Sequence, residues 1–234
     1  MNTVVHKVPS LAIIYDADRM DVPAAETFTP EYWAAHNALQ GEAIGRGSAW
    51  FIDAPFGPVV LRQYLRGGWA AKLSHSRYFF TTIERSRPFL EFDVLASLHE
   101  LELPVPRPLA ALCEHHGVLS SGALMTERIE GAQTLADLLP GATGSQWTDV
   151  GQCIRRFHQA GVWHADLNAR NILLDAQSRV FLIDFDRARF TPGKSVSGDN
   201  NLARLKRSLV KLWPASQAEK LHPAWESLME AYHA

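Results

Sequence analysis

The chain has 234 residues, of which 47% are hydrophobic and 21% charged, the balance of a folded globular protein rather than a disordered or fibrous one. This length is enough for one large core or for two lobes that share a cleft. The apolar stretches, such as residues 11–15, are far below the roughly 20 residues of a membrane-spanning helix, and the N-terminus has no signal-peptide pattern. We therefore expect a soluble cytoplasmic domain in which Cys113 and Cys153 are core thiols.

Although the net charge is only −2, the sequence contains two basic tracts. Residues 41–90 contain only three acidic residues beside the basic residues Arg46, Arg62, Arg66, Lys72, Arg77, Arg85 and Arg87. Residues 187–211 contain Asp199 as their single acidic residue beside Arg187, Arg189, Lys194, Arg204, Lys206, Arg207 and Lys211. Such tracts suggest an anionic partner on one face, although solvated helix faces would give the same pattern.

The first half of the chain predicts strands and one long helix. A short helix is expected over residues 30–40, with Thr29 as its cap and Gly41 after its end. Residues 49–52 and 58–65 predict a β-hairpin with a turn at 53–57, preceded by a glycine-rich entry. Residues 88–101 have helical apolar spacing, and 109–114 and 117–129 are expected to be extended.

The second half is expected to be mainly helical. A helix capped by Ser145 or Thr148 should end at Gly161, and further helices are expected over residues 200–212 and 215–232. Short strands at 171–174 and 180–183 flank a turn at 175–178. The inference is an α+β, two-lobed catalytic domain, with an N-lobe over residues 1–128, a C-lobe over 129–234 and a hinge near 126–131.

Residues 162–174 carry the strongest functional signal. An aspartate, Asp166, is followed five residues later by Asn171, and Asp184 precedes Phe185 thirteen residues after that. This is the spacing of the protein-kinase catalytic loop and of its metal-binding Asp-Phe motif. Asp184 and Asn171 offer the hard oxygen ligands that Mg²⁺ prefers, and Asp166 is placed to accept the proton of a substrate hydroxyl. His164 is interpreted as a packing and hydrogen-bonding residue of the loop.

The candidates for binding a nucleotide come from the first half, and all are weaker signals than the catalytic loop. Two glycines before a strand can approach phosphates or simply form a turn. Arg62 occupies the place where kinases carry a strand lysine, with Glu91 on the next helix as its expected partner, and Lys72 competes with it for the phosphates. The full set of nucleotide-binding candidates, including one at the hinge, is Gly45, Gly47, Arg62, Lys72, Glu91 and Glu127.

These motifs resemble the 3-deoxy-D-manno-octulosonic acid (Kdo) kinase family of the protein-kinase-like superfamily. The resemblance spans about residues 30–213. It rests on the segments 45–47, 61–68, 72–73, 87–98, 103–108, 164–174, 183–186 and 207–209. It implies a protein-kinase-like fold and an ATP- and Mg²⁺-dependent transferase of lipopolysaccharide biosynthesis that phosphorylates the 4-hydroxyl of Kdo on a lipid A precursor. It also implies peripheral contact with the cytoplasmic face of the inner membrane. An anionic glycolipid acceptor agrees with the basic tracts, and Arg66, Lys72, Arg77, Arg85 and Arg87 are the candidates to face it or the membrane.

Departures from the protein-kinase pattern argue against regulation by loop phosphorylation and against a protein substrate. Ala165 stands where regulated kinases carry an arginine, and no Ala-Pro-Glu motif follows Asp184. Neither a nucleic acid nor a protein substrate is expected as a partner. Two alternatives remain open at this point: another small-molecule kinase, for example one acting on a heptose, and an inactive nucleotide-binding module of the same fold.

Overall fold

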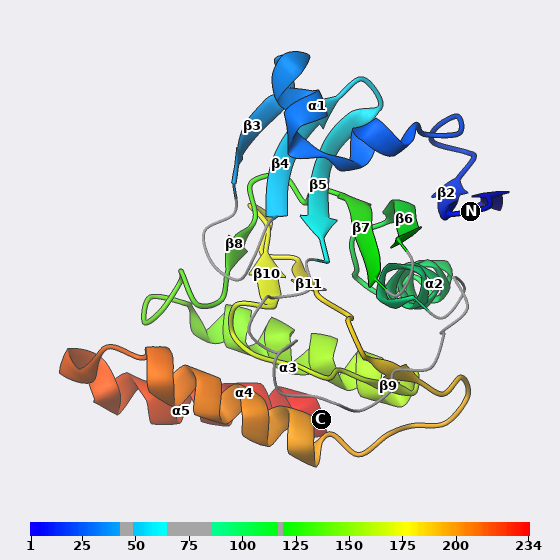
Figure 1. Cartoon of the computed structure of the whole chain (residues 1–234). Helices are drawn as coiled ribbons and strands as arrows, with labels where there is room; N and C mark the ends of the chain where they lie inside the picture. The colour runs from blue at the N-terminus through cyan, green and yellow to red at the C-terminus, as the bar shows by residue number, and fades with distance from the viewer. Residues whose placement is uncertain (43–48, 65–85, 117–118) are drawn as a thin grey trace. The chain divides into compact units, whose positions relative to one another are not determined.

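The computed structural model describes residues 1–42, 49–64, 86–116 and 119–234 (Figure 1). The chain divides into two compact units. The first consists of Met1–Ser97 and Arg107–Arg128, and the second consists of Leu98–Pro106 and Ile129–Ala234. Most strands lie in the first unit and most helices in the second, so the predicted α+β class is confirmed.

The first unit is built on a seven-stranded sheet in the order β1-β2-β6-β7-β5-β4-β3, in which every neighbouring pair is antiparallel. Its core contains Ile13, Leu61 and Met125 from the sheet, packed with Phe28 and Trp33. Burial of these side chains provides the main stabilisation of the unit. The strands are β1 (Thr3–Val8), β2 (Leu11–Asp16), β3 (Leu39–Glu42), β4 (Ala49–Ala54), β5 (Gly57–Gln63), β6 (Pro108–His116) and β7 (Leu119–Glu127).

Sequence patterns predicted most of this sheet. The β4–β5 hairpin and the strands β6 and β7 are confirmed, but β1 and β2 were not predicted. Strand β2 is buried along nearly its whole length, so its side chains do not alternate between polar and apolar in the way that identifies a half-buried strand. The glycine-rich entry at Gly45 and Gly47 lies outside the described residues.

Among the described residues, three helical segments accompany the sheet: η1 (Ala25–Phe28), α1 (Pro30–Ala35) and α2 (Arg87–Glu100). Thr29 caps α1 as predicted, because its hydroxyl oxygen accepts a hydrogen bond from the amide of Tyr32 at 3.4 Å. The predicted end of this helix near residue 40 is wrong. Asn37 adopts a left-handed conformation with φ of 55°, and the chain then turns into β3. The prediction of α2 is confirmed.

The second unit contains the helices α3 (Gly144–Gln159), α4 (Asp199–Leu212) and α5 (Leu221–His233) with the short 3₁₀ segment η4 (Ala215–Lys220). Helices α3 and α5 pack together (Figure 1). Gly151 permits this close approach, since a Cβ atom there would lie 2.2 Å from the carbonyl oxygen of Leu228. Its small sheets are formed by β8 (Gln133–Thr134), β9 (Val162–Trp163), β10 (Ile172–Leu174), β11 (Val180–Leu182) and β12 (Arg189–Phe190).

Two boundaries in the second unit differ from the prediction. Helix α3 is capped by Thr143 rather than by Ser145 or Thr148, because Thr143 and Gln146 form a reciprocal capping box. The single helix expected over residues 215–232 is broken into η4 and α5, because Gln217 has non-helical dihedral angles. Helix α4 and the strands β10 and β11 match the prediction within one residue at each end.

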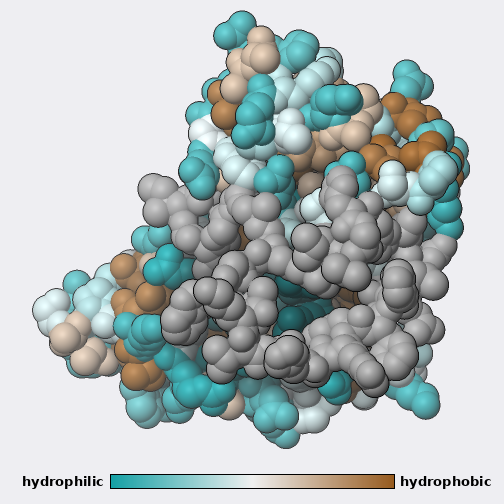
Figure 2. Space-filling model, viewed as in Figure 1, coloured by the Kyte–Doolittle hydropathy of each residue, from teal (hydrophilic) through white to brown (hydrophobic). Residues whose placement is uncertain are grey.

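The described residues include no helix suited to span a membrane. No helix in this part of the chain combines the length and apolar composition needed to cross a bilayer. Among the residues coloured in Figure 2, most of this face is hydrophilic, and hydrophobic side chains gather at a few places near its margins. Val4, Val5 and Val8 of β1 are among the exposed hydrophobic residues.

Candidate active site

Residues 164–171 form a loop between β9 and β10 in the second unit. Strand β9 pairs with β12 and β10 pairs with β11, so a strand pair anchors each end of the loop. The turn before β9 requires Gly161, which has φ of 92°. A Cβ atom at this position would lie 2.0 Å from the carbonyl oxygen of Thr191. This anchoring is the local structure that the predicted catalytic loop requires.

His164 connects this loop to the segment that carries Asp184. Its Nδ1 atom accepts a hydrogen bond from the amide of Asp166 at 3.1 Å, so its Nε2 atom carries the proton and donates to the carbonyl oxygen of Ile183 at 2.9 Å. The buried ring also packs against Phe185, with 4.9 Å between ring centroids. Burial lowers the pKa of His164, which agrees with a neutral ring. The prediction that His164 packs and forms hydrogen bonds is confirmed.

Asp166 presents a partly exposed carboxylate, with a side-chain exposed fraction of 30%. One carboxylate oxygen, Oδ1, accepts a hydrogen bond from Nη1 of Arg204 on α4 at 2.7 Å. Its main-chain oxygen accepts hydrogen bonds from the side-chain amides of Asn168 at 3.0 Å and Asn171 at 2.9 Å. The backbone is therefore held by two side chains while the carboxylate remains accessible to a ligand.

Asn171 and Asp184 are brought together by the β10–β11 pair. Asn171 precedes β10, and its carbonyl oxygen accepts a hydrogen bond from the amide of Ile183 at 3.1 Å. Asp184 follows immediately and has φ of 65°, a conformation that costs a non-glycine residue free energy and is frequent at functional sites. The next side chain, Phe185, is buried and stacks on Phe157. Packing of Phe185 thus holds the main chain in place beside Asp184 and stabilises its strained conformation.

The donor set at this site fits magnesium. The buried Asn171 uses its amide nitrogen to contact Asp166, which leaves its side-chain oxygen as the atom that can bind a metal. Asp184 adds a carboxylate. Within the described residues no group of three or more His, Cys, Asp or Glu side chains could hold a metal alone. Mg²⁺ needs no such group, because it is commonly held by one or two protein oxygens together with water and substrate phosphates.

In the first unit, Arg62 of β5 and Glu91 of α2 form an ion pair, as their positions in the sequence suggested. Glu91 is almost completely buried, and Arg62 is 25% exposed. Tyr64 joins the pair: its hydroxyl donates a hydrogen bond to Glu91 and accepts one of 2.6 Å from Arg62. Burial, followed by the charge of Glu91, raises the pKa of Tyr64. The result is a buried carboxylate satisfied by two donors, with a guanidinium that is partly accessible.

Glu127, at the end of β7, is engaged within the first unit in a way that the sequence did not reveal. Its carboxylate forms an ion pair with Arg19. Its amide donates a hydrogen bond to the carbonyl oxygen of Arg107 at 2.9 Å. The carboxylate is thus held by Arg19 and the amide by the main chain before β6. Lys72 lies outside the described residues, as Gly45 and Gly47 do.

Comparison with known proteins identifies the family. Residues 30–232 match the family described as lipopolysaccharide kinase (Kdo/WaaP). The chain is 46% identical over 222 residues to the 3-deoxy-D-manno-octulosonic acid kinase of Stenotrophomonas maltophilia strain R551-3, covering 94% of this chain and 89% of that protein. Proteins of the same name from Xanthomonas euvesicatoria pv. vesicatoria and Xanthomonas campestris pv. campestris strain B100 are 46% and 45% identical, with the same coverage. This chain belongs to the lipopolysaccharide kinase (Kdo/WaaP) family.

Membership of this family makes the chain a kinase, a phosphotransferase with a hydroxyl acceptor, and gives it a protein-kinase-like fold. The resemblance inferred from sequence motifs is thereby confirmed. Within the second unit, the catalytic loop brings Asp166, Asn171 and the segment of Asp184 together through hydrogen bonds. Within the first unit, Arg62 and Glu91 are brought together as a pair.

The contacts of α4 with the predicted catalytic loop are not evident from the sequence of this family member. There Arg204 is part of a basic tract, and Asn201 belongs to no motif. Asn201 is buried, accepts a hydrogen bond from the amide of His164 at 3.1 Å and donates one of 2.6 Å to its carbonyl oxygen. The available signal was the spacing of Asn201, Arg204 and Ser208, which places three polar side chains on one helical face.

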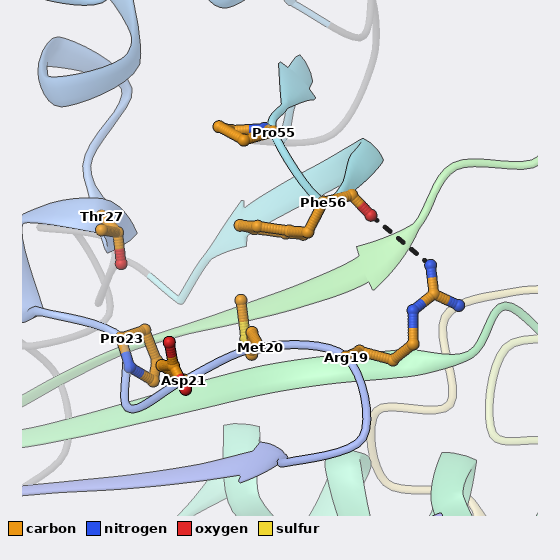
Figure 3. A pocket seen from close by; sticks show the side chains of 7 residues that line it. All are labelled: Arg19, Met20, Asp21, Pro23, Thr27, Pro55 and Phe56. Carbon is orange, nitrogen blue, oxygen red and sulfur yellow. Dashed lines mark hydrogen bonds between the residues drawn. The ribbon is translucent and has the colours of Figure 1, made fainter.

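The first unit of this kinase also contains an open pocket of about 340 Å³ that includes no predicted site residue. Figure 3 shows Arg19 directed toward the carbonyl oxygen of Phe56, a contact of 3.5 Å, while Met20 points toward the ring of Phe56. Since Arg19 also pairs with Glu127, its charge is already compensated. The pocket is lined by Arg19, Met20, Asp21, Pro23, Thr27, Pro55 and Phe56.

Proposed function

We propose that this protein transfers the γ-phosphoryl group of ATP to the 4-hydroxyl of Kdo on a lipid A precursor, in lipopolysaccharide inner-core biosynthesis. The observation that carries the proposal is the identity of 45–46% over nearly the whole chain with proteins named 3-deoxy-D-manno-octulosonic acid kinase. The arrangement of Asp166, Asn171 and Asp184 supports the same chemistry, because phosphoryl transfer requires a positioned hydroxyl and oxygen ligands for a metal.

Asp166 is the proposed catalytic residue. Its carboxylate is partly exposed and its backbone is fixed by Asn168 and Asn171, so it can accept a hydrogen bond from the acceptor hydroxyl without moving. This contact orients the hydroxyl oxygen toward the phosphorus atom and takes up its proton as the new bond forms. His164 supports Asp166 through the main-chain hydrogen bond and, being neutral, adds no charge to the site.

Asn171 and Asp184 are the proposed magnesium ligands. When bound, Mg²⁺ would neutralise part of the charge that spreads over the phosphate oxygens during transfer. The side-chain oxygen of Asn171 is directed by the hydrogen bond that its nitrogen makes to Asp166. Asp184 is held by the packing of Phe185. Both ligands are therefore oriented before the nucleotide arrives.

Arg62 is the proposed cation for the nucleotide phosphates. Glu91 and Tyr64 orient its guanidinium, which is 25% exposed and can therefore bring a positive charge to phosphate oxygens. Gly45, Gly47 and Lys72 remain proposed contacts to the phosphates, as expected from the sequence. Glu127 is proposed to contribute through its main chain, because Arg19 holds its carboxylate.

Peripheral association with the cytoplasmic face of the inner membrane is also proposed. The acceptor would be an anionic lipid, and the basic residues of the tract over residues 41–90 would be attracted to an anionic surface. Reversing the charge of Arg66, Lys72 and Arg77 together should weaken sedimentation with vesicles that contain anionic lipid. Unchanged sedimentation would exclude this part of the proposal and leave the kinase assignment intact.

Transfer of labelled γ-phosphate tests the acceptor. The purified protein is incubated with labelled ATP, Mg²⁺ and a Kdo-bearing lipid A precursor, with the Kdo-free precursor and a heptose as parallel acceptors. The proposal predicts label in the Kdo-bearing lipid alone. Equal labelling of the two lipids would contradict the Kdo assignment, and labelling of the heptose alone would favour a heptose kinase.

A further inference from the structure

Helix α4 lies along the catalytic loop and contacts it through three polar side chains at helical spacing. Asn201 hydrogen-bonds to both the amide and the carbonyl oxygen of His164. Ser208 accepts a hydrogen bond from the amide of Ala169 at 3.2 Å. Arg204, between them in the sequence, contacts the carboxylate of Asp166 at 2.7 Å. The catalytic loop is thus fixed near its beginning, its middle and its end by one helical face.

Arg204 differs from the other two contacts in both partner and exposure. Within the loop, Asn201 and Ser208 bind main-chain groups, so their contacts hold the loop in place. Arg204 binds a side chain, and the side chain is that of the proposed catalytic residue. Arg204 is also 48% exposed, whereas Asn201 is almost completely buried. A ligand can therefore reach the guanidinium of Arg204.

Stability alone does not account for an arginine at this position. An ion pair between partly exposed groups contributes little to folding, because water screens it and ordering two side chains costs entropy. A guanidinium next to the carboxylate that binds the acceptor hydroxyl can instead contribute to binding of the acceptor. Any anionic group close to that hydroxyl on the acceptor will meet the donors of Arg204.

We propose that Arg204 binds the carboxylate of the acceptor sugar acid and thereby selects it over neutral sugars. This inference rests on the proposed function for the identity of the acceptor. In a 3-deoxyoctulosonic acid the carboxyl carbon is attached to C2, and a single ring carbon, C3, separates C2 from the carbon that bears the 4-hydroxyl. The hydroxyl bound by Asp166 and the carboxylate bound by Arg204 are therefore close neighbours in the acceptor, as the two side chains are in the protein.

The planar fork of arginine suits this task. It can donate two parallel hydrogen bonds to a carboxylate, and it can do so while one nitrogen still contacts Asp166. A neutral sugar would place a hydroxyl or a hydrogen there and would lack the charge-assisted hydrogen bonds that a carboxylate makes with Arg204. This difference in hydrogen bonding favours the acid over a neutral acceptor.

The test pairs a variant with a matched change in the acceptor. Wild type and Arg204→Gln are assayed with the Kdo-bearing lipid A precursor and with the same lipid in which the carboxyl group is converted to the carboxamide. We expect wild type to prefer the acid by about 10- to 100-fold in kcat/KM, the effect of losing a hydrogen-bonded charge. Arg204→Gln should lose this preference, with the larger change in the KM for the acceptor and little change in the KM for ATP.

Two further variants keep the test interpretable. Arg204→Lys retains the charge without the fork and should recover part of the preference for the acid. Arg207→Gln removes an exposed charge from the same helix and should retain the full preference. A normal melting temperature for Arg204→Gln would separate loss of binding from loss of structure.

Each result has a defined meaning. If Arg204→Gln still prefers the acid as wild type does, the inference is wrong although the proposed function stands. A selective rise in the KM for ATP would also overturn it and would assign Arg204 to the nucleotide. If wild type transfers no phosphate to either lipid, the proposed function itself fails, and the inference about the carboxylate fails with it.

Discussion

Each unit of this kinase contains an arginine paired with a carboxylate, and the two pairs lie in different environments. In the first unit, Glu91 is buried and is held by Arg62 and Tyr64. In the second, Asp166 and Arg204 are both substantially exposed. Burial makes the first pair part of the folded core, where an unmatched charge is costly, whereas the second pair is accessible to solvent. We therefore expect loss of the carboxylate to lower stability much more in the first pair than in the second.

The largest effect is expected at Asp166. Asp166→Asn keeps the shape of the side chain but removes its ability to take up a proton, and kcat should fall by about 10²- to 10⁴-fold. Single-turnover transfer from labelled ATP measures the loss. Glu219→Gln, an exposed acidic residue of η4, serves as the control and should keep normal kcat. A variant Asp166→Asn with more than half of wild-type activity would exclude Asp166 as the catalytic residue.

The next effect concerns stability. Glu91→Ala should lower the free energy of unfolding by about 2–4 kcal/mol, because it removes a buried charge and leaves Arg62 and Tyr64 without their shared partner. Urea denaturation gives this value from the shift in midpoint at constant slope. Glu100→Ala, at the exposed end of the same helix, is the control and should change it little. Equal midpoints for the two variants would contradict the importance assigned to burial.

A pH effect of intermediate size should arise in the second unit. Burial lowers the pKa of His158 and of His164, so below the usual histidine pKa of about 6.5 the unfolded chain binds protons that the folded chain does not accept. The free energy of unfolding should therefore decrease as pH falls below about 6.5, by up to about 1.4 kcal/mol per pH unit for each histidine. His158→Gln should reduce this slope without abolishing it. Stability that is constant or rises between pH 6.5 and 5 would argue against two buried neutral rings.

The smallest effect on stability should come from Arg204. Arg204→Gln removes a contact between partly exposed groups and should change the free energy of unfolding by about 0–1 kcal/mol. Thermal unfolding of this variant beside Glu91→Ala compares the two pairs directly. A loss for Arg204→Gln as large as that for Glu91→Ala would show that exposure does not separate them.

Sequence patterns predicted residues that belong to a motif better than residues that are defined only by their tertiary contacts. Asp166, Asn171 and Asp184 were selected as candidates because their spacing along the chain reflects a loop between short strands. The pair of Arg62 with Glu91 was suggested by the order of strand and helix. The contacts of Tyr64 with Glu91 and of Arg19 with Glu127 have no such signal, because neither Tyr64 nor Arg19 occupies a motif position that names its partner.

The ends of helices were also predicted less well than their existence. The end of α1 depends on Asn37 adopting a left-handed conformation, which asparagine permits but does not require. The break between η4 and α5 occurs at Gln217, a residue type that favours helix. The contacts of α4 with the catalytic loop are tertiary, so the sequence shows Arg204 as a charged residue but does not show that Asp166 is its partner.

Phosphoryl transfer to the 4-hydroxyl of Kdo is proposed to depend on Asp166. The most direct measurement is the position of the new phosphate in the product, determined by ³¹P–¹H correlation after incubation of the Kdo-bearing lipid A precursor with ATP and Mg²⁺. We predict a single new phosphate, compared with the untreated lipid, coupled to the proton at C4 of Kdo, formed by wild type and absent with Asp166→Asn. A new phosphate at any other carbon, or equal product from the variant, would contradict the proposal.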